Sequence, residues 1–487
     1  MPENTAAPRR SPSDSGTLDR FFRLTERGTT LGTEVRGGLA TFFAMSYIVV
    51  LNPLILGLIA DANGSKLGIV TVAASTSLVS GLMTILMGVI ANQPFAMAAG
   101  LGINAFLAAT IATSESLTWP ELMGLVVWTG IIMFILVLTG FREAVFNAVP
   151  QSLKTAIVCG IGLFISFIGF VNAGFIRRMP DAAGTTVPVS LGVNGDLVGW
   201  PLATFLLGLF LIIFLMLRSI RGSILIGVIA STIFAAVVET LAPSGPQTEN
   251  PRGWSLVVPG LPEQWVSLPD LSLLGQVDMV GAFGSLGGMA ATLMVFAILL
   301  SVFFDAMGTS MGLATEAGSV TQDGRIPGIN KVLAVDAFGS VAGGFGSVSS
   351  SQIFVESATG VGEGARTGLA NVVTGVLFLL SMFVAPLVNI VPFEAVAPAL
   401  VIVGFLMVRQ AVHVQWDDWG LGIPAFLTMA MMPFTYSIAD GIGAGFVSYT
   451  FIRVVQGRGK DVHPLMYVVS AAFILFFGMG VIEGWMR

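Results

Sequence analysis

The segment 343–360 reads GGFGSVSSSQIFVESATG and separates two apolar stretches of the chain. It is too polar for a helix that faces lipid, and its Ser, Gln, Ile, Phe and Val centre predicts a short extended segment. Extended backbone is tolerated at membrane depth only where it is paired inside the protein or lines a cavity. A helix that begins near Glu356 would point its N-terminal amides into that cavity. The segment therefore predicts a broken helix inside a membrane protein, although Gly and Ser would also suit an ordinary surface loop.

The composition of the whole chain supports the membrane interpretation. Of 487 residues, 54% are hydrophobic and 10% are charged, with a net charge of −6, whereas about a quarter of the residues of a soluble chain are charged. One Cys excludes a disulfide framework and every multi-cysteine metal site, and two His argue against a His-rich metal centre. We therefore expect a polytopic membrane protein with no metal and no cofactor, and the small net charge gives no reason to expect nucleic acid as a partner.

Apolar runs occur along most of the sequence. Those long enough to cross about 30 Å of hydrocarbon are 39–60, 68–90, 122–140, 153–171, 200–217, 223–241, 290–313, 368–391 and 466–484. Shorter or interrupted runs are 94–112, 332–347, 348–362, 395–409, 421–434 and 438–455. We expect an all-α fold with about fourteen transmembrane segments. The run 421–434 gives only about 20 Å of helix, which leaves the count near the C-terminus open by one.

Charged residues predict the orientation of these segments. Residues 1–37 contain several Arg and precede the first apolar run without a cleavage site, so they read as a cytoplasmic tail. The long connection 242–288 is mainly acidic, as expected for an extracytoplasmic loop. Arg177 and Arg178 fall on the outer side and are the main exception to positive-inside orientation.

A weak internal repeat divides the chain. The sequence NAVP (147–150) with Gly162 recurs as NIVP (389–392) with Gly404, at a constant offset of 242 residues. The separation indicates two repeats of seven helices. The alternative is a chance similarity, since both segments are drawn from the same few apolar residue types. Two copies with an odd number of spans must be inverted in the membrane, which is the architecture of many secondary transporters.

A lone carboxylate marks a candidate site. The run 298–312 reads ILLSVFFDAMGTSMG, in which Asp305 shares one helix face with Gly308, Thr309 and Gly312. An ionised side chain at this depth costs about 2.5–3.5 kcal/mol on insertion scales. We therefore interpret Asp305 as a functional residue, the alternative being a hydrogen bond that only packs two helices.

A second break is predicted at 93–106, QPFAMAAGLGINAF. Its Pro and Gly residues favour an extended entry followed by a half-helix, which leaves the Asn104 amide to bond inside the bundle. Asp336 is a further buried acid that could bind ligand, carry a proton or tie two helices together.

Two other function classes are less favoured by the sequence. No Ser/His/Asp set, HExxH or Walker motif is present, so we do not expect an enzyme. An anion exchanger or channel should present cations to its substrate, whereas the intramembrane charges here are acids.

Several motifs resemble one transporter family. They are LDRFFRL (18–24), TEVRGGLATFFAMSYI (33–48), GLGINAF (100–106), FDAMGT (304–309), VESATG (355–360) and GARTG (364–368). In this order they resemble the AzgA-type purine permeases of the nucleobase/ascorbate transporter superfamily, also called nucleobase:cation symporter-2, over about residues 18–455.

The resemblance implies a fold of two inverted seven-helix repeats with a core and a gate domain, two short extended segments in broken helices, and often a homodimer. It implies import of adenine, guanine and hypoxanthine by proton symport across the cell membrane; a xanthine or uracil permease, or an anion exchanger of similar fold, is the alternative. The expected domains are a cytoplasmic tail (1–37), a first repeat (38–241; core 39–140, gate 153–241), an extracytoplasmic loop (242–288) and a second repeat (289–487; core 290–391, gate 395–484).

The resemblance also assigns residues. Asp305 and Glu356 correspond to the acidic substrate-binding positions of the eighth and tenth spans, Asn104 to a polar position of the third span, and Asp336 to an acid of the ninth. The family often has a further acid one turn before Asp305, where this chain has Val302.

The chemistry of a purine fits these side chains. A carboxylate can accept two adjacent N–H groups of the base, and half-helix amides with short polar side chains can donate to its ring nitrogens and carbonyl. Aromatic rings can stack on its face. The expected substrate-binding residues are Asp305, Glu356, Asn104, Gly102, Thr309, Ser357, Phe95 and Phe354, and the expected proton carriers are Asp305, Glu356 and Asp336.

Overall fold

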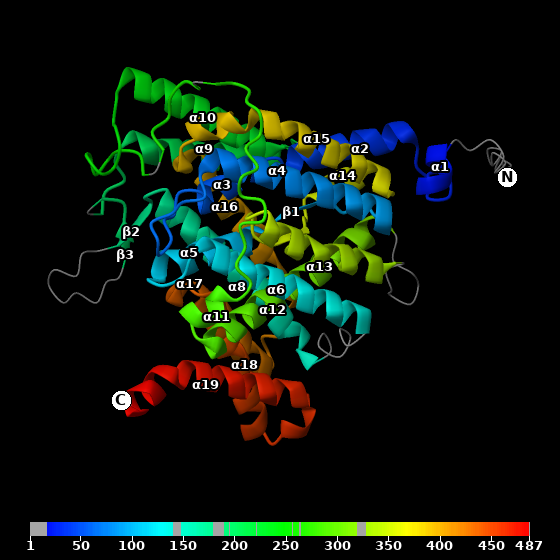
Figure 1. Cartoon of the computed structure of the whole chain (residues 1–487), viewed down its shortest axis with the longest axis vertical. Coiled ribbons are helices and arrows are strands. Elements are labelled where there is room, and N and C mark those ends of the chain that lie inside the picture. Colours follow the sequence, from blue (N-terminus) through cyan, green and yellow to red (C-terminus); the bar gives the residue numbers. More distant parts are fainter. Residues whose placement is uncertain are drawn as a thin grey trace.

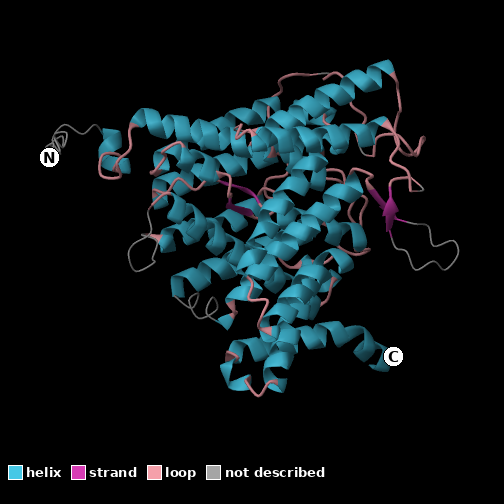
Figure 2. Cartoon of the chain, turned by 180° about the vertical axis from the view of Figure 1, so that it is seen from behind, coloured by secondary structure: helices cyan, strands magenta, loops and turns pink. Residues whose placement is uncertain are grey.

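The computed structural model describes residues 17–139, 148–178, 189–193, 195–220, 222–255, 257–262, 264–318 and 328–486. Residues 1–16 of the expected tail and Asn147 of the repeat lie outside these ranges. The described chain is built almost entirely of helices, with one pair of short strands enclosed in the middle and another at the edge (Figure 2).

The first half of the chain contains the following elements: α1 (Thr17–Phe22), α2 (Leu31–Met45), α3 (Ile48–Leu56), α4 (Ile69–Leu86) with a π-helical end η2 (Met87–Ala91), β1 (Met97–Ala99), α5 (Leu101–Thr113), α6 (Trp119–Thr139), α8 (Gln151–Asn172), β2 (Ile176–Arg178), β3 (Val189–Leu191), α9 (Trp200–Leu217) and α10 (Ser223–Leu241). The first apolar helix begins at Leu31, several residues before the expected start of the first repeat.

The second half contains α11 (Gly281–Ser285), α12 (Gly288–Glu316), α13 (Ile329–Phe345), β4 (Ser351–Ile353), α14 (Ser357–Gly362), α15 (Gly368–Ser381) with η3 (Met382–Ile390), α16 (Phe393–Val408) with η4 (Arg409–His413), α17 (Trp419–Thr435), α18 (Ile438–Val455), η5 (Gly459–Asp461) and α19 (Pro464–Met486). Among the described residues, eight helices are long and apolar enough to cross a membrane, and shorter apolar helices accompany them. The chain is a polytopic helical membrane protein, as its composition predicts.

The helices pack as two halves around one central pair. Helices α8 and α16 pack against each other; α9 contacts α16 and α10, and α17 correspondingly contacts α8 and α18. Figure 1 shows α9 and α10 at the upper end of the molecule, with α18 and α19 at the lower end. This correspondence leaves α19 without a partner in the described part of the first half. The short run 421–434 lies in α17, which has α9 as its counterpart, so the additional C-terminal helix is α19.

The repeated glycines meet where the two halves cross. A Cβ added to Gly162 of α8 would lie 2.7 Å from the carbonyl oxygen of Gly404 in α16. Each helix begins directly after the proline of its motif, Pro150 or Pro392. The motif therefore has a physical role at both copies: the proline starts a helix, and the glycine allows the two backbones to approach.

A second symmetric feature anchors a loop at each end of this pair. Ser152 and Glu394, which are separated by the same offset, each accept a backbone N–H: Ser152 Oγ from Gln415 at 3.2 Å, and Glu394 Oε1 from Ser255 at 2.9 Å. The loop after α16 and the loop after α10 are thus held to opposite ends of the central helices.

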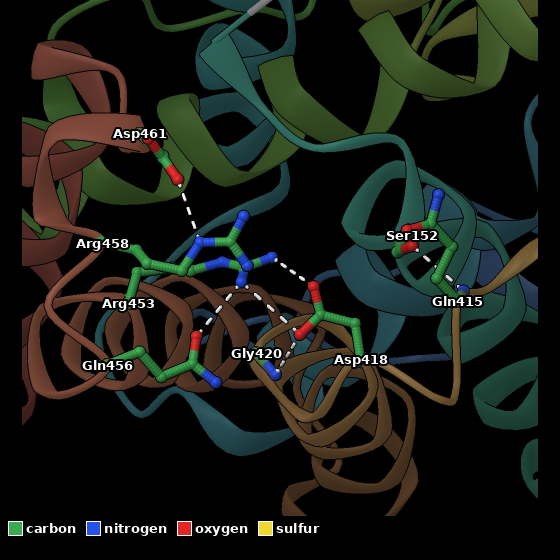
Figure 3. Close-up of polar contacts among 8 residues, drawn as sticks. All are labelled: Ser152, Gln415, Asp418, Gly420, Arg453, Gln456, Arg458 and Asp461. Atoms are coloured by element: carbon green, nitrogen blue, oxygen red, sulfur yellow. Dashed lines mark hydrogen bonds and ion pairs between the residues drawn. The ribbon is translucent and has the colours of Figure 1, made fainter.

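Near the Ser152 end, an ion pair joins α17 to α18 (Figure 3). Arg453 Nη2 lies 2.7 Å from Asp418 Oδ2, and Asp418 Oδ1 also accepts the N–H of Gly420 at 2.8 Å as the N-cap of α17. The Arg453 side chain is 8% exposed and that of Asp418 is 31% exposed. The hydrogen bond from Arg453 lowers the pKa of Asp418 below its ordinary value of 3.8.

We expect Asp418→Asn to lower the melting temperature of the purified protein at pH 7, because it removes the charge that pairs with a buried guanidinium. A carboxylate with a lowered pKa stabilises the fold above its unfolded-state pKa and loses this effect as the pH falls through the folded-state value. The difference between wild type and Asp418→Asn should therefore shrink as the pH falls below about 3.8. Glu249→Gln, at an exposed loop position, is the control; equal melting temperatures of wild type and Asp418→Asn at pH 7 would contradict the expectation.

Candidate functional site

Two helix breaks from different halves of the chain pair with each other. Strands β1 and β4 are antiparallel, with Met97 opposite Ile353 and Ala99 opposite Ser351. The ladder continues beyond the strands, since the N–H of Gly100 donates to the carbonyl of Ser350 at 2.9 Å. The expectation of two extended segments, each paired within the protein, is confirmed.

Each strand is followed by a short helix that begins near the centre of the molecule. Helix α5 starts at Leu101 after β1, and α14 starts at Ser357 with Glu356 at its N-cap. Glu356 is thus placed at a half-helix start, as the sequence predicts. Helix α5 brings the amides of its first turn to this region, whereas the N–H groups of Ser357, Ala358 and Thr359 at the start of α14 already donate to backbone carbonyls.

A cavity of about 380 Å³ lies beside the paired breaks. Its wall contains both Asp305, from the continuous helix α12, and Glu356. Thr309, one turn beyond Asp305, lines the same wall. Apolar side chains of the central helices, including Val158, Ile161, Ile165, Val403 and Leu406, complete it.

The sequence-predicted residues divide into two groups. Those that line the cavity are Gly102, Asp305, Thr309, Phe354 and Glu356. Those outside its lining are Phe95, Asn104, Asp336 and Ser357.

The second group packs behind the wall. Ser357 Oγ accepts the N–H of Ala96 at 2.9 Å, and Asp336 Oδ1 accepts that of Ile353 at 3.3 Å. Both bonds hold the strand pair in place. Phe95 and Asn104 are 0% exposed, and within the described chain neither amide atom of Asn104 has a hydrogen-bond partner.

Tyr47 is a cavity residue that the sequence analysis did not assign. It lies at the junction of α2 and α3 and is 0% exposed, and its hydroxyl donates to Glu356 Oε1 at 2.6 Å. One Glu356 oxygen is therefore already held by the protein. Tyr47 is a polar-tipped aromatic within an apolar run, and that signal could have identified it.

Gln352 is a second unassigned wall residue. It lies in β4 and is 4% exposed, and in the described structure its Nε2 donates to no acceptor. The Gln352 side-chain amide therefore has N–H groups without a protein acceptor among the described residues, and these can donate to a ligand. Ser301, Arg409 and Gln410 also line the wall, and the exposure of Arg409 and Gln410 places the mouth of the cavity at the end of α16.

Val302, which replaces an acid common in the resembling family, is fully buried and does not line the cavity. The described residues contain no cluster of three His, Cys, Asp or Glu that could hold a metal ion. The cavity can thus offer two carboxylates, hydroxyl groups, amide donors and the aromatic rings of Tyr47 and Phe354 to a small ligand.

Comparison with known proteins identifies close relatives. Residues 32–444 match the family described as "Permease family". The chain is 37% identical to the adenine permease AdeQ of Escherichia coli over 465 residues, which covers 95% of this chain and 96% of that protein. It is 36% identical to the guanine/hypoxanthine permease PbuG of Bacillus subtilis over 463 residues, covering 94% and 99%.

Solved structures of similar fold have much lower identity. The transmembrane domain of a cyanobacterial bicarbonate transporter, BicA, aligns with a TM-score of 0.56 at 16% identity, covering 85% of this chain and 97% of that one. The anion transporter SLC26A9 aligns with a TM-score of 0.60 at 12% identity, covering 94% and 73%. These similarities support the seven-plus-seven inverted-repeat fold and carry no information on the substrate.

We expect Gly339→Ala to destabilise the strand pair. A Cβ at Gly339 of α13 would lie 2.5 Å from the carbonyl oxygen of Ser351 and 2.6 Å from the Met97 side chain, so β4 must shift, and overpacking of this kind costs about 1–3 kcal/mol. The measurement is the melting temperature in detergent. Gly362→Ala is the matched control, because nothing lies within 4 Å of its added Cβ; equal effects of the two substitutions would refute this account.

Proposed function

The chain belongs to this permease family, and we propose that it is a secondary active transporter that imports purine nucleobases, namely adenine, guanine and hypoxanthine, by proton symport. A family of permeases identifies a transporter rather than an enzyme. The assignment of the substrate to this chain rests on its relatives, the adenine permease and the guanine/hypoxanthine permease. The observation that carries the mechanism is the shared cavity of Asp305 and Glu356.

The cavity has the groups that a purine requires. Asp305 accepts N–H groups of the base, and the free oxygen of Glu356 accepts another, because Tyr47 already occupies Oε1. The backbone amides at the start of α5, near Gly102, and the Gln352 amide donate to the acceptors of the ring. The volume of about 380 Å³ leaves room for a bicyclic base with some water.

The remaining predicted residues contribute in two ways. Phe354, 7% exposed at the wall, stacks on the ring, and the Thr309 hydroxyl adds a bond beside Asp305. Phe95, Asn104 and Ser357 act from behind the wall by holding the two breaks in position.

The coupled proton is carried by Asp305 or Glu356. A buried carboxylate can take up a proton on the acidic side and release it on the other, and a bound base that requires the ionised form would link the two events. Asp336 accepts a hydrogen bond from the backbone of β4. Its proposed part in proton coupling is therefore indirect: it holds the strand that precedes Glu356 in position.

Alternating access follows from movement of a core against a gate. The core consists of α2–α6 and α12–α15 with the strand pair, and the gate of α8–α10 and α16–α19. With the N-terminus in the cytoplasm of the cell and Arg409 at the cavity mouth, the structure corresponds to a cytoplasm-facing state. A homodimer in the cell membrane completes the proposal.

Uptake of radiolabelled bases in a host without its own purine permeases tests this function. Adenine, guanine or hypoxanthine should accumulate, and a protonophore should abolish accumulation. Accumulation of only xanthine or uracil would refute the substrate assignment and support the alternative, a xanthine or uracil permease. Uptake of bicarbonate or chloride without any base would support an anion exchanger.

Asp305→Asn and Glu356→Gln should each abolish accumulation against a gradient, because each removes both a charged acceptor and a candidate proton carrier. Asp270→Asn, in an exposed loop, should accumulate base like the wild type. Proton-coupled uptake at normal rates in both cavity variants would remove these residues from the mechanism.

Tyr47→Phe should raise the KM for the base by about tenfold. A hydrogen bond to a charged group contributes about 1.5–3 kcal/mol, and we expect other contacts of Glu356 to replace part of this energy. Its ring still fills the space, so the expected loss is confined to the orientation of Glu356. Tyr467→Phe is the control, since it also removes an O–H bond, to the carbonyl of Gly459 at 2.8 Å, outside the cavity. An unchanged KM in Tyr47→Phe would show that Glu356 needs no positioning.

A further inference from the structure

A second cavity, of about 450 Å³, lies at the other end of the central helices. It is enclosed by the end of α8, strand β2, residues 192–193 after β3, the start of α9, the loop 244–255 and the first turn of α16. It shares no lining residue with the transport cavity. Along α8, Val171 is six residues beyond Ile165, or about 9 Å of helix, so the two cavities are separate.

A buried carboxylate faces this second cavity. Glu394 is 1% exposed and lines the wall. Its Oε1 accepts the N–H of Ser255, whereas its Oε2 has no hydrogen-bond partner in the described chain. A buried acceptor without a donor is unfavourable, and an ammonium or other N–H group of a ligand would satisfy it.

Two guanidinium groups lie in the same wall, from Arg177 and Arg252. Burial lowers the pKa of Arg177, and the charge of Glu394 opposes that shift. Nevertheless, no ion pair within 4 Å joins Glu394 to either arginine in the part of the chain that is described. The opposite charges are arranged around the cavity rather than neutralised by each other.

Arg177 is held in place by neutral acceptors. Its Nη1 donates to the carbonyl of Pro251 at 3.0 Å, and the amide oxygen of Gln247, in its favoured orientation, accepts from Nη1 at 2.8 Å and Nη2 at 3.1 Å. Gly174, with φ +70°, lets the guanidinium lie across its turn. The positive charge is therefore fixed but not cancelled.

The loop that carries Arg252 and Ser255 is also rigidly built. The Glu239 carboxylate accepts from the Trp254 indole at 2.7 Å and from the N–H groups of Ser244 and Gly245 at 2.8 and 2.9 Å. Trp254 is 0% exposed. The cavity is thus a preformed site and not a gap under a loose loop.

We propose that this cavity binds a small amino-dicarboxylate, the chemical class of glutamate and aspartate. One ammonium group bonds to Glu394, and two carboxylates pair with Arg177 and Arg252, so that the ligand charges of +1 and −2 complement the wall charges of −1 and +2. Gly174, Pro251 and Gln247 accept four of the five N–H groups of Arg177, so Arg177 offers one N–H to a carboxylate. Arg252 can bind the other carboxylate in bidentate geometry. Aliphatic side chains such as Val171, Ile176 and Leu202 accommodate the carbon chain. In the proposed orientation the ligand enters from the extracytoplasmic side. The site does not depend on the proposed function.

Calorimetric titration of the full-length protein in nanodiscs tests the site. Glutamate should bind saturably, and glutarate, which lacks the ammonium group, should bind at least about tenfold more weakly. Saturating adenine should leave glutamate binding unchanged, because the cavities are separate. Displacement of glutamate by adenine, or equal binding of glutamate, glutarate and inorganic phosphate, would overturn the proposal.

Three variants connect the binding to the named groups. Glu394→Gln keeps the acceptor for Ser255 and should weaken glutamate at least about tenfold while leaving glutarate unchanged. Arg252→Gln, at an exposed position, should weaken both ligands. Glu249→Gln, exposed in the same loop, is the matched control and should bind both as the wild type does. A melting temperature equal to that of the wild type verifies folding of each variant, and unchanged glutamate affinity in Glu394→Gln would refute the site.

Discussion

The backbone of a membrane protein must satisfy its own hydrogen bonds, and the pairing of β1 with β4 is where this chain meets that constraint. Two helices are interrupted inside the protein, and each would leave unpaired N–H and C=O groups if it stood alone. Because the breaks come from opposite halves, each supplies the partner that the other lacks. Helices α5 and α14 then begin from fixed points, which places Glu356 opposite the continuous helix α12. The cavity is a consequence of this pairing.

Much of this architecture follows from residue patterns. The polar segment around Gln352 cannot be a lipid-facing helix, and the repeated proline and glycine, Pro150 with Gly162 and Pro392 with Gly404, mark two equivalent helices. These inferences succeed because each depends on a local rule about backbone hydrogen bonds or close packing. The start of the first apolar helix at Leu31 was not predictable, because few apolar residues distinguish its first turns from the preceding tail. The sequence also does not show that α19 lacks a counterpart in the described part of the first half.

The candidate site was less completely predictable. Asp305, Glu356, Thr309, Gly102 and Phe354 line one cavity, whereas Asn104, Phe95, Ser357 and Asp336 lie behind it. A sequence shows that a residue belongs to a break, but the direction of its side chain depends on how the two halves meet. For the same reason Tyr47 escaped notice: its hydroxyl reaches Glu356 across 309 residues of sequence, and no periodicity records such a contact.

Buried acids in this chain serve different roles, and the number of protein donors around each one distinguishes them. Both oxygens of Glu34 are bonded to N–H groups at the start of α15, from Arg366, Thr367 and Ala370, so this acid is a tie between helices. Glu356 receives one hydroxyl and faces a cavity, and Glu394 receives one N–H and faces another. A carboxylate held by one bond is oriented by the protein yet keeps a free oxygen, and it is this partial satisfaction, rather than burial itself, that suits an acid to binding a ligand.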